Sequence, residues 1–223
     1  MTFNARAAFL FAALAVAQCA SAGEIAASAD LGSTGLGLHL STPLAAKLNA
    51  RIGINVAKYS YDGSTSDVDY DFKLKLATAD ALLDYHPFDG SFRISGGVVY
   101  NGNKIDAHAR PNAAGSYDIN GTVYSAATVG RLDGKIDFRK AAPYLGIGWG
   151  NALKQSGWSV GLDLGVTFQG SPNTALASSG CTASAASCAQ LARDIAAENA
   201  KLADEVDDFK LYPVVRAGIS YRF

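Results

Sequence analysis

The fold is decided by the C-terminal stretch Pro213-Val-Val-Arg-Ala-Gly-Ile-Ser-Tyr-Arg-Phe223, in which two kinds of side chain alternate. One set is Val215, Ala217, Ile219, Tyr221 and Phe223, and the other is Val214, Arg216, Gly218, Ser220 and Arg222. Successive side chains of a β-strand point to opposite faces of the sheet. The chain therefore ends on a strand with one apolar face and one largely polar face.

The N-terminus has the layout of a secretory signal peptide. Arg6 precedes an apolar run over residues 7–17, and Ala20-Ser-Ala22 follows as a cleavage site with small residues. The run is too short to span a bilayer as a helix, which needs about 20 residues. We predict a signal peptide over residues 1–22.

The mature chain, residues 23–223, is expected to be one domain. Cys19 allows a lipoprotein interpretation, but Gln18 stands before it where a small residue is expected. No later stretch approaches the roughly 18 uncharged apolar residues of a membrane-spanning helix. The net charge of −1 gives no case for binding nucleic acid.

Two cysteines remain in the mature chain, Cys181 and Cys188. In an oxidising compartment such a close pair predicts one local disulfide. The alternative is a zinc site, which needs about four ligands, and no histidine lies near this pair. We therefore expect a structural disulfide, with no metal and no cofactor.

Period-two alternation recurs along the chain, with turn residues between the alternating segments. A slip in register near Ala77–Thr78 predicts a β-bulge. The seven predicted strands are residues 36–41, 48–56, 68–85, 92–100, 136–150, 158–168 and 213–223.

A membrane barrel has an even number of strands, so an eighth strand is needed. We place it at Glu24–Leu31, followed by a turn through Gly32–Gly35. The alternative splits Lys135–Gly150 at Pro143, which would move a long loop to the periplasmic side. The resulting prediction is all-β: an eight-stranded antiparallel transmembrane β-barrel.

In each predicted strand the polar residues lie on one face, and their composition distinguishes a soluble β-sandwich from a membrane barrel. They are rich in glycine and carry both charge signs, which suits a narrow lumen with apolar residues facing lipid. Aromatic residues near strand ends are typical of interfacial girdles: Tyr59, Tyr61, Tyr85, Phe92, Trp149, Trp158 and Phe223. The charges predicted to form a lumen network are Arg51, Asp69, Asp71, Lys73, Lys75, Arg93, Asp137, Arg139, Asp163, Arg216 and Arg222.

Counting strands backwards from the C-terminus predicts which connections face outward. Short periplasmic turns are expected at Pro43–Lys47, His86–Gly90 and Asn151–Ser156, with long external loops at Asp106–Gly134 and Gly170–Asp208.

The first external loop contains the turn signal Asn120-Gly121, which predicts a hairpin above the membrane. Apolar residues between Cys188 and Phe209 recur at helical spacing, which predicts an amphipathic helix in the last external loop. We expect this helix to pack on the barrel rim or on an adjacent loop; the alternative is that it serves as a lid or a partner-docking element.

Several motifs carry a resemblance to a known family. They are Tyr85-His-Pro-Phe88, Phe92-Arg-Ile-Ser-Gly-Gly97, Pro143-Tyr-Leu-Gly-Ile-Gly-Trp-Gly150, Phe168-Gln-Gly-Ser-Pro172 and the Tyr-Arg-Phe223 end. Together they resemble small proteobacterial outer-membrane proteins, broadly the OmpA/OmpW-type, porin-like barrels. The resemblance implies fold and location but no established activity.

The same resemblance implies the partners. Ile219, Tyr221 and Phe223 would form the signal read by the barrel-assembly machinery, and the barrel would contact outer-membrane lipid and lipopolysaccharide. A monomer is the simplest expectation, and any external ligand is unidentified.

Three functions remain open from the sequence. A structural or surface-binding role, without enzymatic activity, fits a lumen closed by paired charges and a large external surface. A narrow channel for small solutes or ions, gated by those pairs, is the alternative. The third is a lipid A-modifying hydrolase, because the His39-Leu-Ser41 spacing resembles lipid A deacylase barrels. That pair is expected near the periplasmic end, whereas such an enzyme works at the outer leaflet.

Overall fold

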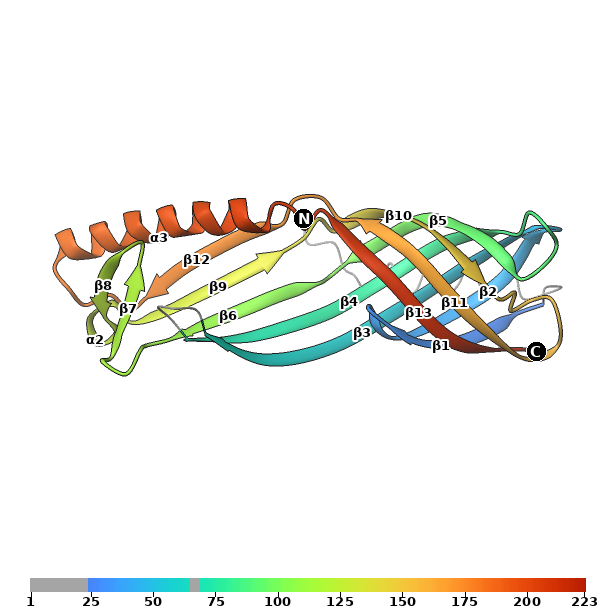
Figure 1. Ribbon diagram of the computed structural model, residues 1–223, viewed down its shortest axis with the longest axis horizontal. Helices are drawn as coiled ribbons and strands as arrows, with labels where there is room; N and C mark the ends of the chain where they lie inside the picture. Colours follow the sequence, from blue (N-terminus) through green and yellow to red (C-terminus); the bar gives the residue numbers. More distant parts are fainter. Residues whose placement is uncertain (1–23, 65–68) are drawn as a thin grey trace, which may run out of the picture.

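The computed structural model describes residues 24–64 and 69–223 as a closed barrel that continues at one end into a projecting sheet (Figure 1). Neighbouring strands of the wall pair antiparallel, and β1 closes the ring by pairing with β13, Ala26 opposite Arg222. In ring order the wall strands are β1 (Ala26–Gly32), β2 (Gly35–Ala45), β3 (Leu48–Ser64), β4 (Asp69–Tyr85), β5 (Phe92–Asn101), β10 (Ala141–Trp149), β11 (Gly157–Phe168) and β13 (Leu211–Arg222). The predicted eight-stranded barrel is confirmed.

The eighth strand lies close to where parity placed it, since β1 occupies most of the predicted Glu24–Leu31 segment. The prediction of one continuous strand over residues 136–150 is wrong. The structure breaks it at residues 138–140, and only the second part, β10, belongs to the barrel wall. Pairing decides this, because β10 lies between β5 and β11 whereas the preceding residues pair outside the ring.

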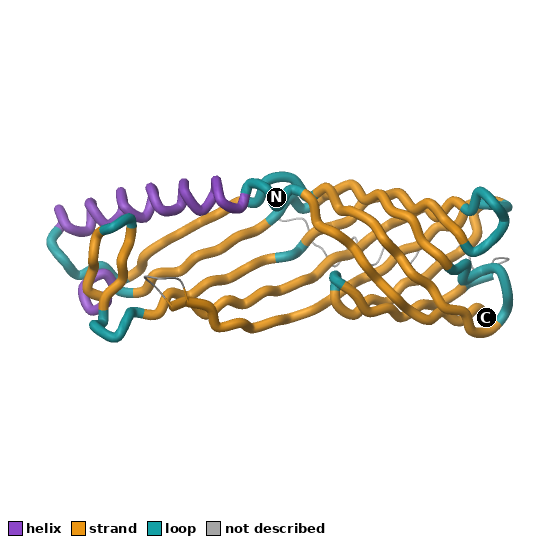
Figure 2. The backbone as a smooth tube through the Cα atoms, viewed as in Figure 1, coloured by secondary structure: helices purple, strands orange, loops and turns teal. Residues whose placement is uncertain are grey.

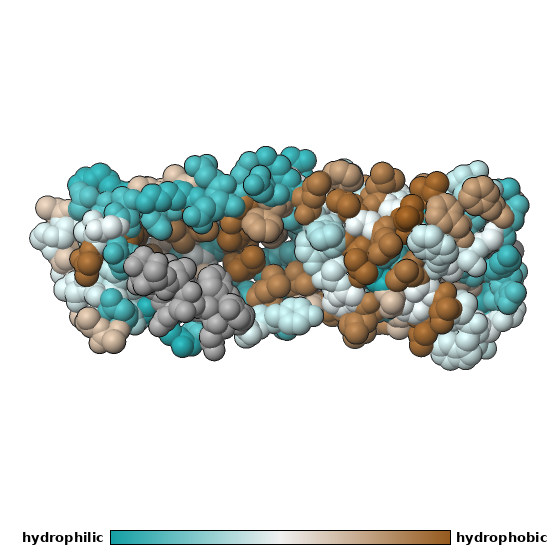
Figure 3. Space-filling view, viewed as in Figure 1, coloured by the Kyte–Doolittle hydropathy of each residue, from teal (hydrophilic) through white to brown (hydrophobic). Residues whose placement is uncertain are grey.

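The barrel is apolar outside and polar inside. Figure 3 shows apolar side chains gathered over the barrel part of the surface. Exposed apolar residues of the wall include Leu36, Leu38, Ile54, Val56, Leu83, Val98, Leu145, Val160, Val215 and Ile219. Aromatic rings contact one another at the end that carries the short turns, as in the edge-to-face pairs Phe92–Trp149 and Trp158–Tyr221. This is the arrangement expected of a lipid-facing surface with an interfacial girdle.

The strands β3 and β4 are each 17 residues long, well beyond the roughly 9–11 residues that cross a membrane. Their distal halves leave the barrel and form a projecting sheet with β6 (Lys104–Arg110), β9 (Arg131–Asp137) and β12 (Asn173–Ser179). Figure 2 shows β3 and β4 running on from the barrel without interruption. Much of the two predicted long loops is therefore regular secondary structure.

Register is unbroken along the whole β3–β4 pair, from Leu48 opposite Tyr85 to Ser64 opposite Asp69. The bulge predicted near Ala77–Thr78 is therefore absent. The irregularity lies on the other side of β4, where its partner changes from β5 to β6 and Gly102 N–H donates to the Ala77 carbonyl oxygen at 2.8 Å. The partner strand is interrupted, and β4 itself runs straight through.

The far end of the projecting sheet carries a small folded cap. The hairpin of β7 (Ser116–Ile119) and β8 (Thr122–Ser125) turns through Asn120 and Gly121, which both have positive φ, as predicted. The short helix α2 (Ala126–Val129) follows, and α3 (Ala185–Val206) lies along β12 (Figure 1). Among the described residues no helix is long and apolar enough to cross a membrane.

The cap has its own hydrophobic core. Leu191 and Ile195 of α3 are buried there, which supports the interpretation that the helix packs on an adjacent loop. The Cys181–Cys188 disulfide is present beside this core and joins the segment before α3 to its first turn. The core residues are Tyr117, Ile119, Val129, Leu132, Leu191 and Ile195.

Candidate functional site

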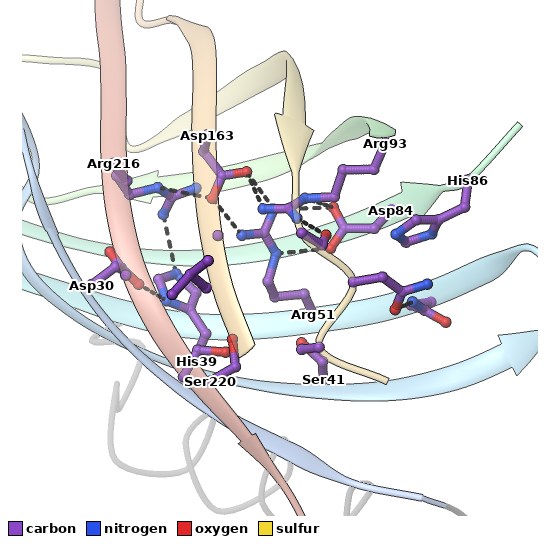
Figure 4. Close-up of a pocket in the computed structure, with 18 residues that line it drawn as sticks. Asp30, His39, Ser41, Arg51, Asp84, His86, Arg93, Asp163, Arg216 and Ser220 are labelled. Carbon is purple, nitrogen blue, oxygen red and sulfur yellow. Dashed lines mark hydrogen bonds and ion pairs between the residues drawn. The ribbon is translucent and has the colours of Figure 1, made fainter. Parts of the chain in front are cut away.

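Eight ionisable side chains meet inside the barrel, and we call them the lumen charge cluster; Figure 4 labels all of them except Asp80. They come from seven of the eight wall strands, all except β10. Their side chains are between 1% and 10% exposed. The members are Asp30, His39, Arg51, Asp80, Asp84, Arg93, Asp163 and Arg216.

One half of the cluster centres on Arg51. Its Nε lies 2.9 Å from Asp84 Oδ2, and its Nη1 lies 2.8 Å from Asp163 Oδ2. Arg93 Nη2 approaches the second oxygen of Asp163 at 2.8 Å, and the Ser95 hydroxyl donates to Asp84 at 2.5 Å. Each carboxylate is therefore held by at least two donors, as a buried charge requires.

The other half centres on Asp80. Its Oδ2 lies 3.2 Å from Arg216 Nη1 and 3.1 Å from His39 Nε2, and it accepts a hydrogen bond from Asn55 Nδ2 at 2.9 Å. The other ring nitrogen of His39, Nδ1, lies 2.7 Å from Asp30 Oδ2. The imidazole is thus clamped between two carboxylates from different wall strands.

The cluster is close to electrically balanced. Three guanidinium groups face four carboxylates, and Arg216 joins the two halves because its Nε lies 3.9 Å from Asp163 Oδ2. An imidazolium at His39 donates to both of its carboxylates and brings the cluster to neutrality. A neutral ring keeps the bond to Asp30 and accepts from Arg216 Nη1, 3.1 Å from His39 Nε2.

Glycines make room for these large side chains. A Cβ on Gly53 would overlap the His39 imidazole, and one on Gly148 would come within 2.8 Å of Arg93 Nε. A Cβ on Gly165 would likewise overlap the Tyr144 ring, which fills the lumen beside Arg216. The glycine-rich inward set of the sequence therefore has a steric cause: glycine on one strand accommodates a bulky polar residue from another.

Small cavities lie on both sides of the cluster. One, of about 50 Å³, reaches towards the short turns and is bordered by His86 and Asn151. The other, of about 20 Å³, reaches towards the projecting sheet and is bordered by Thr34 and Gln169. Arg216 borders both. Each cavity holds a few water molecules at most, because a single water needs about 10–15 Å³ on this measure.

Comparison with known proteins identifies solved structures with a similar fold. No protein-family model matches the sequence, and no curated protein matches it. Two crystal structures from Acinetobacter baumannii, of CarO2 and CarO, are both 22% identical to this chain. CarO2 has a TM-score of 0.56, with 90% of this chain and 98% of that chain covered. CarO has a TM-score of 0.55, with 89% and 97% covered.

A third structure, a major outer membrane protein of Thermus thermophilus, has a TM-score of 0.46 at 16% identity, with 91% of this chain and all of that chain covered. The deciding observation is in the chain itself: a closed antiparallel barrel with charges inside and an apolar exterior, the inverse of a water-soluble protein. The protein is a small outer-membrane β-barrel protein. By the usual rule for such barrels, we expect its short turns to face the periplasm and its projecting sheet to face outward.

In this outer-membrane barrel, four residues of the predicted lumen network meet in the cluster: Arg51, Arg93, Asp163 and Arg216. Their carboxylate partners Asp30, Asp80 and Asp84 were not among the predicted residues. The signal for two of them was present in Ala79–Tyr85, where aspartates lie among apolar residues. The prediction assumed a bulge near Ala77–Thr78, and with that bulge the charged residues 69–75 would have pointed into the lumen instead.

The other predicted network residues lie elsewhere. Since β4 has no bulge, Lys73 and Lys75 point to the outer face of the projecting sheet. Asp71 is on that face too, where it pairs with Arg110, and the side chain of Asp69 lies outside the described residues.

The remaining three network residues are also outside the cluster. Asp137 ends β9 and pairs with Lys135 at 2.8 Å, while Arg139 is exposed in the following connection. Arg222 lies at the end of the barrel that carries the short turns, where it contacts Glu24 and donates to the Leu153 carbonyl oxygen at 2.6 Å.

The histidines offer little catalytic geometry. His39 and Ser41 share the lumen face, but Nε2 of His39 faces Asp80 and Arg216. A nucleophile–base pair needs that nitrogen beside the hydroxyl. His86 is buried, with a pKa lowered chiefly by that burial, and His108 lies in β6 with its Nδ1 2.6 Å from Asp133 Oδ1.

Proposed function

We propose that this chain is a closed outer-membrane anchor that displays its projecting sheet and cap at the cell surface. The observation that carries the proposal is the lumen charge cluster, which crosses the lumen between the two cavities. Three of its ion pairs, Arg51–Asp163, Arg93–Asp163 and Arg216–Asp80, join strands that are not neighbours in the wall. They therefore brace the barrel internally as well as occupying the space through which a solute would pass.

The energetics favour a closed lumen. Removing one partner of a buried ion pair costs about 3–5 kcal/mol, and opening a path here would separate more than one pair. A difference of about 3 kcal/mol already limits an open state to about 1% of molecules. A resting barrel is therefore expected to be closed.

The cap supports the display role. Its hydrophobic core, its disulfide and the strands it shares with the barrel hold a defined surface above the membrane. A flexible loop would have no need of these features, since ordering a chain costs about 1–2 kcal/mol per residue. Surface binding is the role for which a rigid platform is suited.

A narrow channel is the second candidate, and one observation favours it. Arg216 borders both cavities, so it is a side chain whose movement would help to connect them. Under this proposal the cluster is a gate that opens when the Arg216–Asp80 and Arg216–Asp163 contacts break.

Conductance separates the two candidates. Purified protein in planar bilayers is expected to show no discrete openings at neutral pH, and regular openings would favour the channel.

Labelling of intact cells with a membrane-impermeant amine reagent is expected to reach Lys201 on α3 and not Lys154 in a periplasmic turn. If the acyl pattern of lipid A changes with expression of the protein, the hypothesis of a lipid A-modifying hydrolase would be supported.

A further inference from the structure

The outer face of the projecting sheet continues the lipid-facing side of the barrel and is densely charged. On β3 and β4 the apolar residues that face lipid occupy every second position. Because the two strands keep their register, the residues that continue this period into the projecting sheet lie on the same side. Lys58 follows Val56 on β3 in this way, and Lys75 precedes Ala77 on β4. The polarity of this face therefore switches abruptly from apolar to cationic.

Three lysines form a row across three adjacent strands, which we call the lysine row. Lys58 lies directly opposite Lys75, and Lys75 lies directly opposite Lys104 of β6. All three side chains are exposed. Like charges directly opposite on neighbouring strands are destabilising, so the fold itself gives no reason for this arrangement.

Nearby carboxylates neutralise the row only in part. Asp106 Oδ2 lies 2.6 Å from Lys75 Nζ, and this hydrogen bond lowers the pKa of Asp106. Asp137, which is opposite Lys104 in register, is instead held by Lys135 at 2.8 Å. Within the described part of the chain neither Lys58 nor Lys104 forms an ion pair, so the row keeps a positive surplus.

The lysine row lies at the level of the outer membrane interface. Tyr85 is at the periplasmic end of β4 among the girdle aromatics, and about ten residues separate it from Lys75, or roughly 33 Å of strand. With a strand tilt of about 40°, this spans about 25 Å along the membrane normal, which is the height of the apolar band of such barrels. The row therefore emerges where lipid headgroups begin.

We propose that the lysine row binds the phosphate groups of phosphorylated glycolipids in the outer leaflet. Phosphate oxygens accept charge-assisted hydrogen bonds from ammonium groups, and an anion placed between the three lysines would relieve their mutual repulsion. Charge sign, position at the interface and orientation towards surrounding lipid all fit this occupant. The site is independent of whether the lumen conducts.

The test uses the full mature protein, refolded in zwitterionic detergent, with purified diphosphoryl lipid A as the probe and native mass spectrometry as the readout. Wild type is expected to bind the lipid. The variant K58Q/K75Q/K104Q is expected to bind on the order of 100-fold more weakly, from about fivefold for each lysine near an anionic lipid surface. A variant K58R/K75R/K104R should bind like wild type.

Matched controls make the outcome specific. The variant K47Q/K154Q/K201Q removes three exposed lysines away from the row and should bind like wild type. Dephosphorylated lipid A should bind wild type as weakly as diphosphoryl lipid A binds the glutamine variant. Equal binding by the dephosphorylated lipid, an unaffected glutamine variant, or full displacement by inorganic phosphate at matched concentration would each overturn the proposal. A heat-dependent gel shift verifies that every variant is folded.

Discussion

Arg51 and Asp163 bind each other across the lumen, with Arg51 Nη1 2.8 Å from Asp163 Oδ2, although three wall strands separate β3 from β11 in the ring. Neighbouring strands of a barrel are already joined by backbone hydrogen bonds. A pair between strands that are not neighbours adds a constraint that the ladders do not supply. It fixes the width of the lumen and leaves little room for passage.

Loss of Arg51 is expected to destabilise the barrel. Arg51→Ala leaves Asp84 and Asp163 without their shared guanidinium, and a buried pair broken in this way costs about 3–5 kcal/mol. Urea unfolding of the protein refolded in micelles measures the change in unfolding free energy. Lys154→Ala, at an exposed position in the turn between β10 and β11, should change it by less than about 0.5 kcal/mol. Equal effects of the two variants would show that the cluster contributes nothing.

Removing the Arg216 side chain is expected to create brief openings. Arg216 borders both cavities, so we expect the substitution Arg216→Ala to connect them and to admit water and small ions. Single-channel recording in planar bilayers should detect discrete events absent from wild type. Arg222→Ala, on the same strand but bordering neither cavity, should remain silent, and openings there would mean that the leak arises elsewhere.

A methyl group at position 53 should disturb the cluster from the neighbouring strand. In Gly53→Ala the new Cβ overlaps the His39 ring, which is clamped between Asp30 and Asp80 and has nowhere to move. Such overpacking costs roughly 1–3 kcal/mol, measurable as a lower midpoint in urea. Gly90→Ala is the matched control, since the nearest atom to its Cβ is 3.7 Å away.

The attachment of α3 to the cap should depend on pH. The Tyr124 hydroxyl donates to Asp194 on α3; burial and this bond raise the pKa of Tyr124 to about 12, while the same bond lowers the pKa of Asp194. The tyrosine contribution to stability is complete below about pH 10, its unfolded value, and is lost as pH rises to about 12. The aspartate contribution is present above about pH 4 and is lost in stronger acid.

Far-ultraviolet circular dichroism follows this attachment, because α3 is the longest helix among the described residues. Wild type should lose helical signal between about pH 10 and 12, where Tyr124 ionises beside a carboxylate. Tyr124→Phe should show a smaller change over that interval, since its ring cannot ionise. The same alkaline transition in both proteins would assign it to other groups.

The disulfide is expected to stabilise the cap alone. Cys181 and Cys188 close a loop of few residues, for which chain entropy gives about 2–3 kcal/mol. In the variant C181S/C188S, protease added to intact cells should cut near α3 faster than in wild type. The heat-dependent gel shift of the barrel should be unchanged, and its loss would show that the two parts fold as one unit.

Much of the architecture followed from the sequence, because period-two alternation reports directly on two-sided strands. The closing strand, the apolar exterior, the hairpin at Asn120-Gly121, the disulfide and the helix are all local patterns. The eighth strand came from parity and was also correct. Local patterns failed at residues 136–150, because alternation continues in β9 and β10 although the two strands have different partners, one outside the ring and one within it.

The sequence by itself determined that the chain forms a lipid-facing barrel with a polar lumen, since side-chain period and turn residues are properties of neighbouring positions. Only the tertiary structure decided which charges meet. Arg51 reaches Asp163 because barrel closure and shear bring distant strands together, and these depend on the register of every pair around the ring. Register also places Lys75 on the outer face. A bulge near Ala77–Thr78 would have turned every earlier residue of β4 to the opposite side, and the structure has no such bulge.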